Sequence, residues 1–303
     1  MIQVEKLHSL TGHRDCVYTV EASDSAAHIF SAGGDGMVVR WNLAAPEEGE
    51  LIAKLPNSVY AIHYLYKADH LIAGHNYEGI HLLDWKEKKE IASLKLSSAS
   101  IFDIQSFQND VLVASGDGSV TIVDLEKWMV KKKLEASLKS ARVIAINPVA
   151  GEMAVGYSDY FIRIFSLDDY ALKLEFHAHQ NSVFTLRYTP DYKFLISGSR
   201  DAHLKVWDVH SGYVQIVEVG AHLFAINHMV FSPSGNHFAT GSMDKSIKVW
   251  DAKELKLLKV IDKARHAGHG TSVNKLFWTS FNDQLVSASD DRTLSVWRLK
   301  FDA

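Results

Sequence analysis

The sequence is poor in cysteine and proline and has no long hydrophobic run. Cys16 is the only cysteine, so no disulfide can form within the chain, and we expect a reducing, cytoplasmic environment. The five prolines and the lack of low-complexity tracts argue against a disordered tail. The first residues, MIQVEKLHSL, contain no apolar signal-peptide core, and no stretch of 18 apolar residues occurs. We therefore predict neither a secretion signal nor a membrane span.

The chain also lacks a strong charge of either sign, because its formal net charge is only −4 over 303 residues. This balance disfavours DNA or RNA as a partner and gives no sign of binding to an anionic membrane. Cys-x-x-Cys and His-Glu-x-x-His spacings are absent, and GGDG (33–36) is not followed by the helix of a phosphate-binding loop. We therefore predict no cofactor.

Histidine is the one metal-binding residue type that is plentiful, with 16 copies. The stretch RHAGHG (265–270) and the group His63, His70, His75 and His81 are the places where a metal ion could be held. Because no metal-binding spacing accompanies them, we interpret them as exposed histidines of turns and predict no metal site.

Internal repeats dominate the sequence. Four segments, among them LISGSRDAHLKVWDV and FATGSMDKSIKVWDA, share small residues, a turn aspartate and a closing tryptophan, and three weaker copies fill the gap between them. The closing positions follow one another at intervals of 40–47 residues, and they are Trp41, Leu83, Val123, Phe165, Trp207, Trp250 and Trp297. Seven copies of about forty residues leave almost none of the chain unassigned, which indicates a repeat architecture.

Each copy predicts four short antiparallel strands. Segments such as HLKVW and SIKVW alternate apolar and polar residues, and Gly-Asp, Arg-Asp and Ser-Asp pairs supply the turns. A sheet of this size cannot bury both of its faces alone, whereas seven sheets packed around an axis can. We therefore predict an all-β fold, a single seven-bladed β-propeller spanning residues 1–303 with four-stranded antiparallel blades. The blade cores are expected at about 12–56, 57–96, 97–135, 136–177, 178–220, 221–262 and 268–299, with residues 3–10 as the strand that completes the last blade.

These repeats resemble the WD-repeat family of seven-bladed propellers over essentially the whole chain. Four copies have the family's opening Gly-His or Ala-His and its closing Trp-Asp or a close variant, whereas copies two to four lack both the histidine and the tryptophan. The resemblance implies that function belongs to the surfaces of the propeller, as it does in repeat scaffolds generally.

A histidine, a serine and an aspartate near SGSRDAHLKVWD have the composition of a hydrolase triad: His179, Ser197 and Asp201. The same residue types recur in all four strong copies, with the histidine always 22 residues before the aspartate and 28 before the tryptophan. An enzyme needs one triad, so we interpret the set as structural. The resemblance implies hydrogen-bonded chains inside the blades, formed by His13, Ser31, Asp35, Trp41, His179, Ser197, Asp201, Trp207, His222, Thr240, Asp244, Trp250, His269, Ser287, Asp291 and Trp297.

Copies two to four have Tyr77, Asp117 and Asp159 at the aspartate position, where the two aspartates are expected to cap turns. Apolar packing is expected to replace the network in these blades, so we hypothesise that blades 2–4 are softer.

The resemblance also implies a face on which partners bind. Its candidate residues are Tyr18, Tyr60, Phe102, Arg142, Phe184, Arg200, Asn227 and Asn274, with Met243 and Asp290 beside them. In blade 4 the alignment allows either Arg142 or Ile144 at this position. Aromatics and arginines favour a protein interface, although the same rings could merely fill the mouth of the channel.

We therefore predict a monomeric, non-catalytic scaffold that binds a protein or peptide. Two alternatives stay open: an enzyme with a site in the central channel, where Asp103 is the one candidate carboxylate, and a nucleic-acid-binding propeller.

Overall fold

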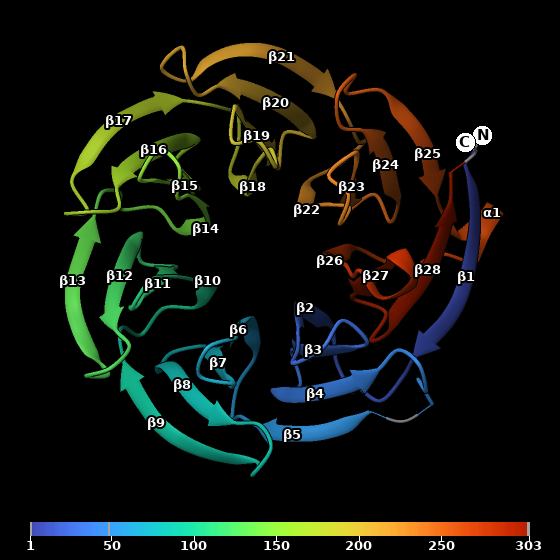
Figure 1. The fold of residues 1–303 in the computed structure, drawn as a ribbon, viewed down its shortest axis with the longest axis horizontal. Coiled ribbons are helices and arrows are strands. Elements are labelled where there is room, and N and C mark those ends of the chain that lie inside the picture. Colours follow the sequence, from blue (N-terminus) through green and yellow to red (C-terminus); the bar gives the residue numbers. More distant parts are fainter. Residues whose placement is uncertain (1, 48, 302–303) are drawn as a thin grey trace. The chain divides into compact units, whose positions relative to one another are not determined.

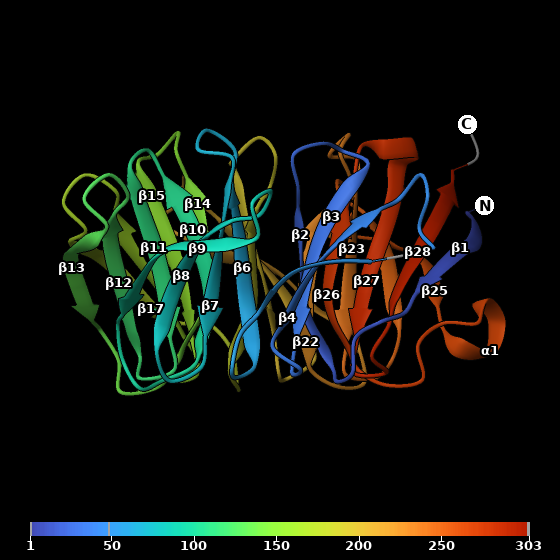
Figure 2. The same ribbon diagram turned by 90° about the horizontal axis from the view of Figure 1, so that it is seen from below.

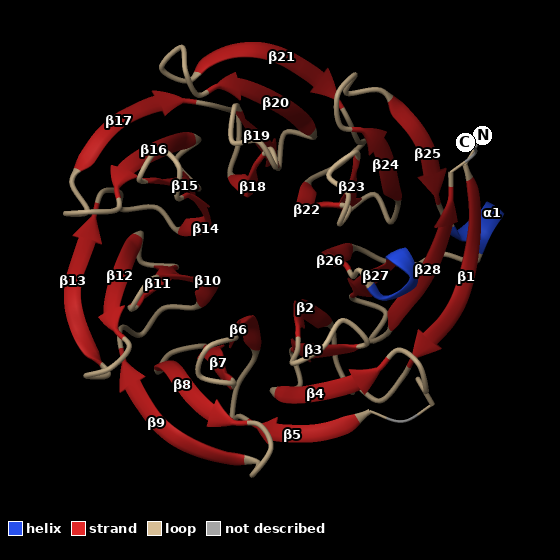
Figure 3. Ribbon diagram, viewed as in Figure 1, coloured by secondary structure: helices blue, strands red, loops and turns tan. Residues whose placement is uncertain are grey.

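The computed structural model describes residues 2–47 and 49–301. Within these residues, 28 strands form seven four-stranded antiparallel sheets, and the predicted all-β seven-bladed β-propeller is confirmed (Figure 1). Strands make up nearly all regular structure in this part of the chain, and the exceptions are α1 (Lys263–His266) and the 3₁₀ turn η1 (Phe281–Asp283) (Figure 3).

The sheets follow one another in the sequence, and we number them accordingly. Sheets 1 to 3 consist of β2 (Val17–Ala22), β3 (His28–Gly33), β4 (Met37–Asn42) and β5 (Glu50–Lys54); β6 (Val59–Leu65), β7 (His70–His75), β8 (Gly79–Asp84) and β9 (Lys89–Lys95); and β10 (Ile101–Phe107), β11 (Asp110–Ser115), β12 (Ser119–Asp124) and β13 (Met129–Glu135). Sheets 4 and 5 consist of β14 (Ala141–Asn147), β15 (Glu152–Tyr157), β16 (Phe161–Ser166) and β17 (Leu172–His177); and β18 (Val183–Tyr188), β19 (Phe194–Ser199), β20 (His203–Asp208) and β21 (Val214–Gly220). Sheet 6 consists of β22 (Ile226–Phe231), β23 (His237–Ser242), β24 (Ile247–Asp251) and β25 (Leu257–Ile261).

Sheet 7 joins the two ends of the chain. Its strands are β26 (Val273–Trp278), β27 (Gln284–Ser289), β28 (Leu294–Lys300) and β1 (Gln3–Leu10), and β1 lies antiparallel along β28 (Figure 2). The pairing runs from Gln3 opposite Lys300 to Leu10 opposite Leu294, and Leu10 is buried. The prediction that residues 3–10 complete the last sheet is therefore confirmed, and β28 has no open edge.

The chain divides into two compact units. The first contains the residues up to 73, residues 82–91 and the residues from 227 onward, and the second contains residues 74–81 and 92–226. Sheets 1, 6 and 7 thus belong to the first unit, apart from Ile226, the first residue of β22, which is the last residue of the second unit. Sheets 3, 4 and 5 lie in the second unit.

Residues of neighbouring sheets approach closely where the second strand carries a glycine near its end, as in β7 and β15. A Cβ atom on Gly156 of β15 would lie 2.7 Å from the Cγ1 atom of Val183, the first residue of the next sheet. A Cβ atom on Gly74 of β7 would likewise lie 2.6 Å from the Cγ2 atom of Ile101, the first residue of β10. Only a residue without a side chain permits this approach.

The fourth strands carry the polar side chains. In β13 the three lysines Lys131, Lys132 and Lys133 are exposed, whereas every residue of β11 is buried. The KKK run therefore lies on an outer strand, where lysines discourage pairing with a strand of another molecule.

Candidate functional site

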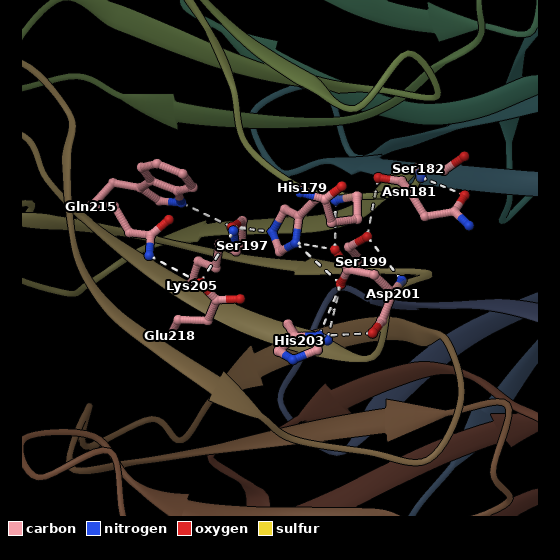
Figure 4. A network of polar contacts seen from close by, with 12 residues as sticks. His179, Asn181, Ser182, Ser197, Ser199, Asp201, His203, Lys205, Gln215 and Glu218 are labelled. Carbon is pink, nitrogen blue, oxygen red and sulfur yellow. Dashed lines mark hydrogen bonds and ion pairs between the residues drawn. The ribbon is translucent and has the colours of Figure 1, made fainter.

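The residues of the apparent triad form one hydrogen-bonded chain inside sheet 5. Figure 4 shows the imidazole of His179 between Ser197 and Asp201. The indole N–H of Trp207 donates to the Ser197 hydroxyl over 2.9 Å, and this hydroxyl lies 2.7 Å from Nε2 of His179. Nδ1 of His179 lies 3.0 Å from the carboxylate of Asp201. Because the serine accepts from the indole, its own proton points to Nε2, and the imidazole donates through Nδ1 to Asp201.

The same chain recurs in sheets 1 and 7. In sheet 1, Nε2 of His13 and the indole nitrogen of Trp41 each lie 2.8 Å from the Ser31 hydroxyl. In sheet 7, His269 and Trp297 stand in the same relation to Ser287, also at 2.8 Å. The imidazoles reach Asp35 at 3.0 Å and Asp291 at 2.8 Å. In sheet 6, Trp250 donates to Thr240 over 2.9 Å, and His222 is buried.

Burial removes these serines from any substrate. Ser31, Ser197 and Ser287 have no exposed surface, and each already holds an indole and an imidazole. A nucleophile must reach its substrate from a site that the substrate can enter. The three identical arrangements are therefore parts of the sheets.

The pKa shifts of His13 and His179 favour the neutral form of their imidazoles. Burial lowers the pKa values of His13 and His179, although the neighbouring carboxylates act in the opposite direction. Burial also tends to raise the pKa of Asp201, yet the hydrogen bonds that it accepts from His179 and from the N–H groups of Gln180 and His203 hold this pKa well below its usual range. Asp35 and Asp201 thus stay ionised while His13 and His179 are neutral at pH 7.

Sheets 2, 3 and 4 fill the corresponding positions with apolar side chains. Leu83, Val123 and Phe165 stand at the tryptophan position and are buried. Ala73, Val113 and Val155 stand at the hydroxyl position and are fully buried.

The turn residues of these sheets behave differently from one another. Asp117 accepts from the N–H of Ser119 over 3.0 Å, and Asp159 from that of Phe161 over 3.2 Å, so both aspartates cap their turns. Asp159 also accepts from Arg163 over 2.8 Å, and Arg163 is nearly buried beneath it. The expectation that these sheets rely on apolar packing is thus incomplete for sheet 4, which contains an arginine-centred polar group.

The candidate partner-binding residues share one feature of backbone geometry. Seven of them occupy the second residue of the first strand of each sheet, and we call them the first-strand positions: Tyr18, Tyr60, Phe102, Arg142, Phe184, Asn227 and Asn274. In β2, β10, β14, β18 and β26 the register shifts at this residue, so that it pairs with no residue of the second strand. Such a bulge redirects a side chain, and bulges are common beside functional sites.

In the first unit, the first-strand positions contact one another or a neighbouring strand. The rings of Tyr18 and Tyr60 lie 4.5 Å apart, and burial followed by the proximity of Tyr60 raises the pKa of Tyr18. Asn227 donates to the Ser272 hydroxyl over 2.9 Å. Asn274 donates to the carboxylate of Asp290 over 2.7 Å and to a backbone carbonyl of β2 over 2.9 Å.

In the second unit, an arginine lies between two aromatic rings. The guanidinium carbon of Arg142 is 4.0 Å from the ring centre of Phe102 and 4.6 Å from that of Phe184. The alternative alignment of blade 4 is excluded, because Ile144 is fully buried and its N–H donates to Asp103 over 2.8 Å. Arg142 therefore occupies the first-strand position of sheet 4.

Arg200 and Met243, each placed before a turn aspartate, are exposed. The sequence interpretation missed Leu223 and Phe224, which are 83% and 60% exposed in the connection from β21 to β22. Two large apolar residues directly after the opening histidine were the signal in the sequence, since no other strong copy has a large apolar residue there.

The carboxylate considered for an enzyme has structural partners. Asp103 is nearly buried and accepts from the N–H groups of Ile104 and Ile144 and from the side chain of Gln105. A cleft of about 360 Å³ in the first unit is lined at one side by Asp24, which Arg40 holds at 2.7 Å.

The interpretation of these histidines as exposed turn residues is wrong, and the departure is largest for two of them. His75 is fully buried and His81 is 8% exposed, and both lie in strands. His63 and His70 are half-buried strand residues, His266 is half-buried in α1, and His269 belongs to the chain in sheet 7. No spacing rule for turns could reveal this, because burial is set by the side chains that pack around the strand.

Comparison with known proteins agrees with this architecture. The family described as WD40 (WD domain, G-beta repeat) matches residues 4–42, 171–208, 214–251 and 261–298, about half of the chain. The solved WD40 β-propeller domain of Doa1 superposes with a TM-score of 0.86 over 97% of both chains at 17% identity, which shows a shared fold. The chain belongs to the WD40 family.

Among curated proteins, the chain is 24% identical to a ribosome biogenesis protein WDR12 homolog of Trichoplax adhaerens over 72% of its own length and 48% of that relative. It is 24% identical to transducin-like enhancer protein 2 of Mus musculus over 67% of its length and 27% of that protein. A striatin homolog of Dictyostelium discoideum is 20% identical over 69% of the chain and 30% of that protein. The chain thus spans less than half of each of these relatives. Among residues 2–47 and 49–301, no helix is long and apolar enough to cross a membrane.

Proposed function

We propose that the chain is a non-catalytic scaffold that binds a protein or peptide partner through its first-strand positions together with Arg200. The observation that carries the proposal is the group formed by Phe102, Arg142 and Phe184, a half-buried guanidinium between two rings on bulged residues. Aromatic and arginine side chains in partly desolvated positions supply most of the energy at protein interfaces.

Family membership supports the same function. The relatives have different names, one of them in ribosome biogenesis, so the repeat they share with this chain fits an interaction module better than one particular activity. We further propose that the protein is a monomer of the cytoplasm, a compartment with which a single cysteine is compatible.

An affinity capture with wild type and the Tyr60→Ala/Phe184→Ala variant tests the proposal. We expect at least one protein that wild type retains to be lost from the variant, and its affinity measured with purified components to fall about 30-fold or more, since a hot-spot side chain contributes about 2 kcal/mol. The melting temperature of both proteins is measured in parallel.

The matched control is Tyr66→Ala/Tyr192→Ala, which removes aromatic rings from the turns that follow the first strands of the same two sheets. This control should retain the partner. If the first-strand variant keeps every partner and loses only melting temperature, its rings serve packing and the proposal is wrong.

A further inference from the structure

Sheet 2 contains a pair of buried histidines next to a carboxylate. His75 is the last residue of β7 and His81 the third residue of β8, and Glu78 lies in the turn that joins these strands. The two imidazole rings are 5.4 Å apart and nearly perpendicular. All three residues belong to the second unit.

This pair is peculiar to sheet 2. In the repeat alignment, His75 stands eight residues before the closing position and His81 two residues before it, and no other copy has a histidine at either place. The pair therefore does not belong to the repeated network, whose histidine, hydroxyl and tryptophan are all missing from this sheet. A polar pair buried without a role in the repeat calls for its own explanation.

The three side chains offer metal-ligating atoms that already converge. One ligand atom from each of His75, Glu78 and His81 lies within 4.8 Å of the other two, and Nδ1 of His75 is 3.9 Å from the Glu78 carboxylate. Around a tetrahedral Zn²⁺ with bonds of about 2.0–2.1 Å, ligand atoms are about 3.3 Å apart. The Glu78 side chain is 58% exposed, so its carboxylate has room to rotate toward the imidazoles.

A cleft of about 150 Å³ gives solvent access to this place. It is lined by Glu78, Ile80, His81, Ser93, Leu94 and Lys95. The cleft has room for a water molecule as a fourth ligand. Lys95 lies on the exposed strand β9, and its long side chain can keep the ammonium group in solvent.

We propose that His75, His81 and Glu78 form a binding site for one Zn²⁺ ion, with water from the cleft in the fourth position. Two imidazoles and a carboxylate suit Zn²⁺, and three protein ligands plus water are the usual composition of an open zinc site. The ion would join β7 to β8 in a sheet that lacks the histidine–serine–tryptophan chain.

Titration of the metal-free full chain with Zn²⁺, read by competition with a fluorescent chelator, tests the site. We expect one ion to bind more tightly than those held by the other histidines, and Co²⁺ to give the visible absorption of a tetrahedral complex. Glu78→Gln should weaken binding by about 10-fold or more, as even changes next to metal ligands do, and His81→Gln should abolish it.

The matched control is His70→Gln, which removes a half-buried histidine from the same strand β7 and should bind as wild type does. Glu78 is exposed, so its variant should keep the metal-free melting temperature, and Zn²⁺ should raise that temperature in wild type but much less in Glu78→Gln. The proposal fails if wild type does not bind one Zn²⁺ ion more tightly than the others. It also fails if wild type and all variants bind Zn²⁺ with the same affinity, because the ions would then be held by surface histidines.

Discussion

Sheets 4 and 5 lie in the same unit, and they fill equivalent interior positions with different side chains. Sheet 5 holds its strands with the chain from Trp207 through Ser197 and His179 to Asp201. Sheet 4 has Phe165 and Val155 in place of the tryptophan and the serine, and both are buried. Its polar group instead centres on an arginine.

In sheet 4, Arg163 donates to Asp159 over 2.8 Å and to Glu175 over 2.9 Å, and its guanidinium carbon lies 4.7 Å from the ring centre of Tyr157. Tyrosines also connect neighbouring sheets, because Tyr170 donates to Asp110 over 2.5 Å and Tyr213 to Glu152 over 2.8 Å. A repeat that loses its internal network can thus retain polar contacts at other positions. The repeat thus sets the strands, whereas the polar groups inside them differ from one sheet to the next.

The largest effect should come from removing residues 1–10, because sheet 7 would lose its outer strand while retaining its network. Leu10 is buried and Glu5 pairs with Arg298, so the deletion exposes both the edge and the apolar face of β28. We expect the truncated chain to unfold or aggregate, as seen by circular dichroism and size-exclusion chromatography. Ser9→Ala, at an exposed position of β1, is the control, and an unchanged melting temperature after truncation would refute this role of β1.

Asp201→Ala should lower the free energy of unfolding by about 1–3 kcal/mol, because it leaves the N–H of His179 and a backbone N–H without their acceptor. Asp117→Ala removes the turn aspartate of sheet 3, which has no histidine to support, and should cost less. Urea denaturation of both variants measures the difference. Equal losses would mean that the network adds nothing beyond the turn.

Acid should weaken the sheets that contain networks. Unfolded histidines take up protons below their ordinary pKa of 6.5, whereas His13 and His179 have lowered pKa values when folded. The unfolded state then binds more protons, so stability falls as the pH drops below about 6.5, by at most about 1.4 kcal/mol per pH unit for each histidine.

The carboxylates act in the same direction at lower pH. Folding lowers the pKa values of Asp35, Asp201 and Asp291, so their contribution is present above their unfolded pKa and is lost as the pH falls further. Urea midpoints at pH 7.5 and 5.5 measure the histidine part. A midpoint that is the same at both pH values would contradict neutral, buried imidazoles.

The smallest effect concerns dynamics. We expect the amide hydrogens of β11 in sheet 3 to exchange a few times faster than those of β19 in sheet 5, because sheet 3 has only apolar packing where sheet 5 has the network. Native-state hydrogen exchange followed by mass spectrometry compares the two strands directly. Equal protection would show that apolar packing is as effective as the network.

Much of the fold could be predicted because it depends on local, repeated patterns. The seven closing positions, the alternation in the strands and the spare N-terminal strand were enough to predict seven sheets and the pairing of β1 with β28. The numbers of residues that separate the histidine, the hydroxyl residue, the aspartate and the tryptophan along the sequence are the same in each strong copy. Three of these copies have the corresponding hydrogen bonds.

The candidate sites were less predictable, because their side chains come together only across sheets. Arg142 contacts Phe102 and Phe184, each about forty residues away, and the bulges that turn these residues aside leave no mark in hydrophobic periodicity. For the same reason the sequence left Asp103 as a candidate carboxylate for an enzyme. In the structure its carboxylate accepts a hydrogen bond from the N–H of Ile144 in the next sheet.

The sequence by itself determined the number of repeats and the order of the strands, and its resemblance to the WD-repeat family implied the polar chains that three of the strong copies form, because all of these depend on spacings inside one repeat. The tertiary structure alone decided which side chains are buried and which repeats meet. His75 and His81 illustrate this limit of the sequence. They are six residues apart and were interpreted as turn histidines, and only the packing of sheet 2 places their rings together in the interior. A side chain becomes buried through the residues that surround it after folding, and the sequence of one repeat does not contain all of these residues.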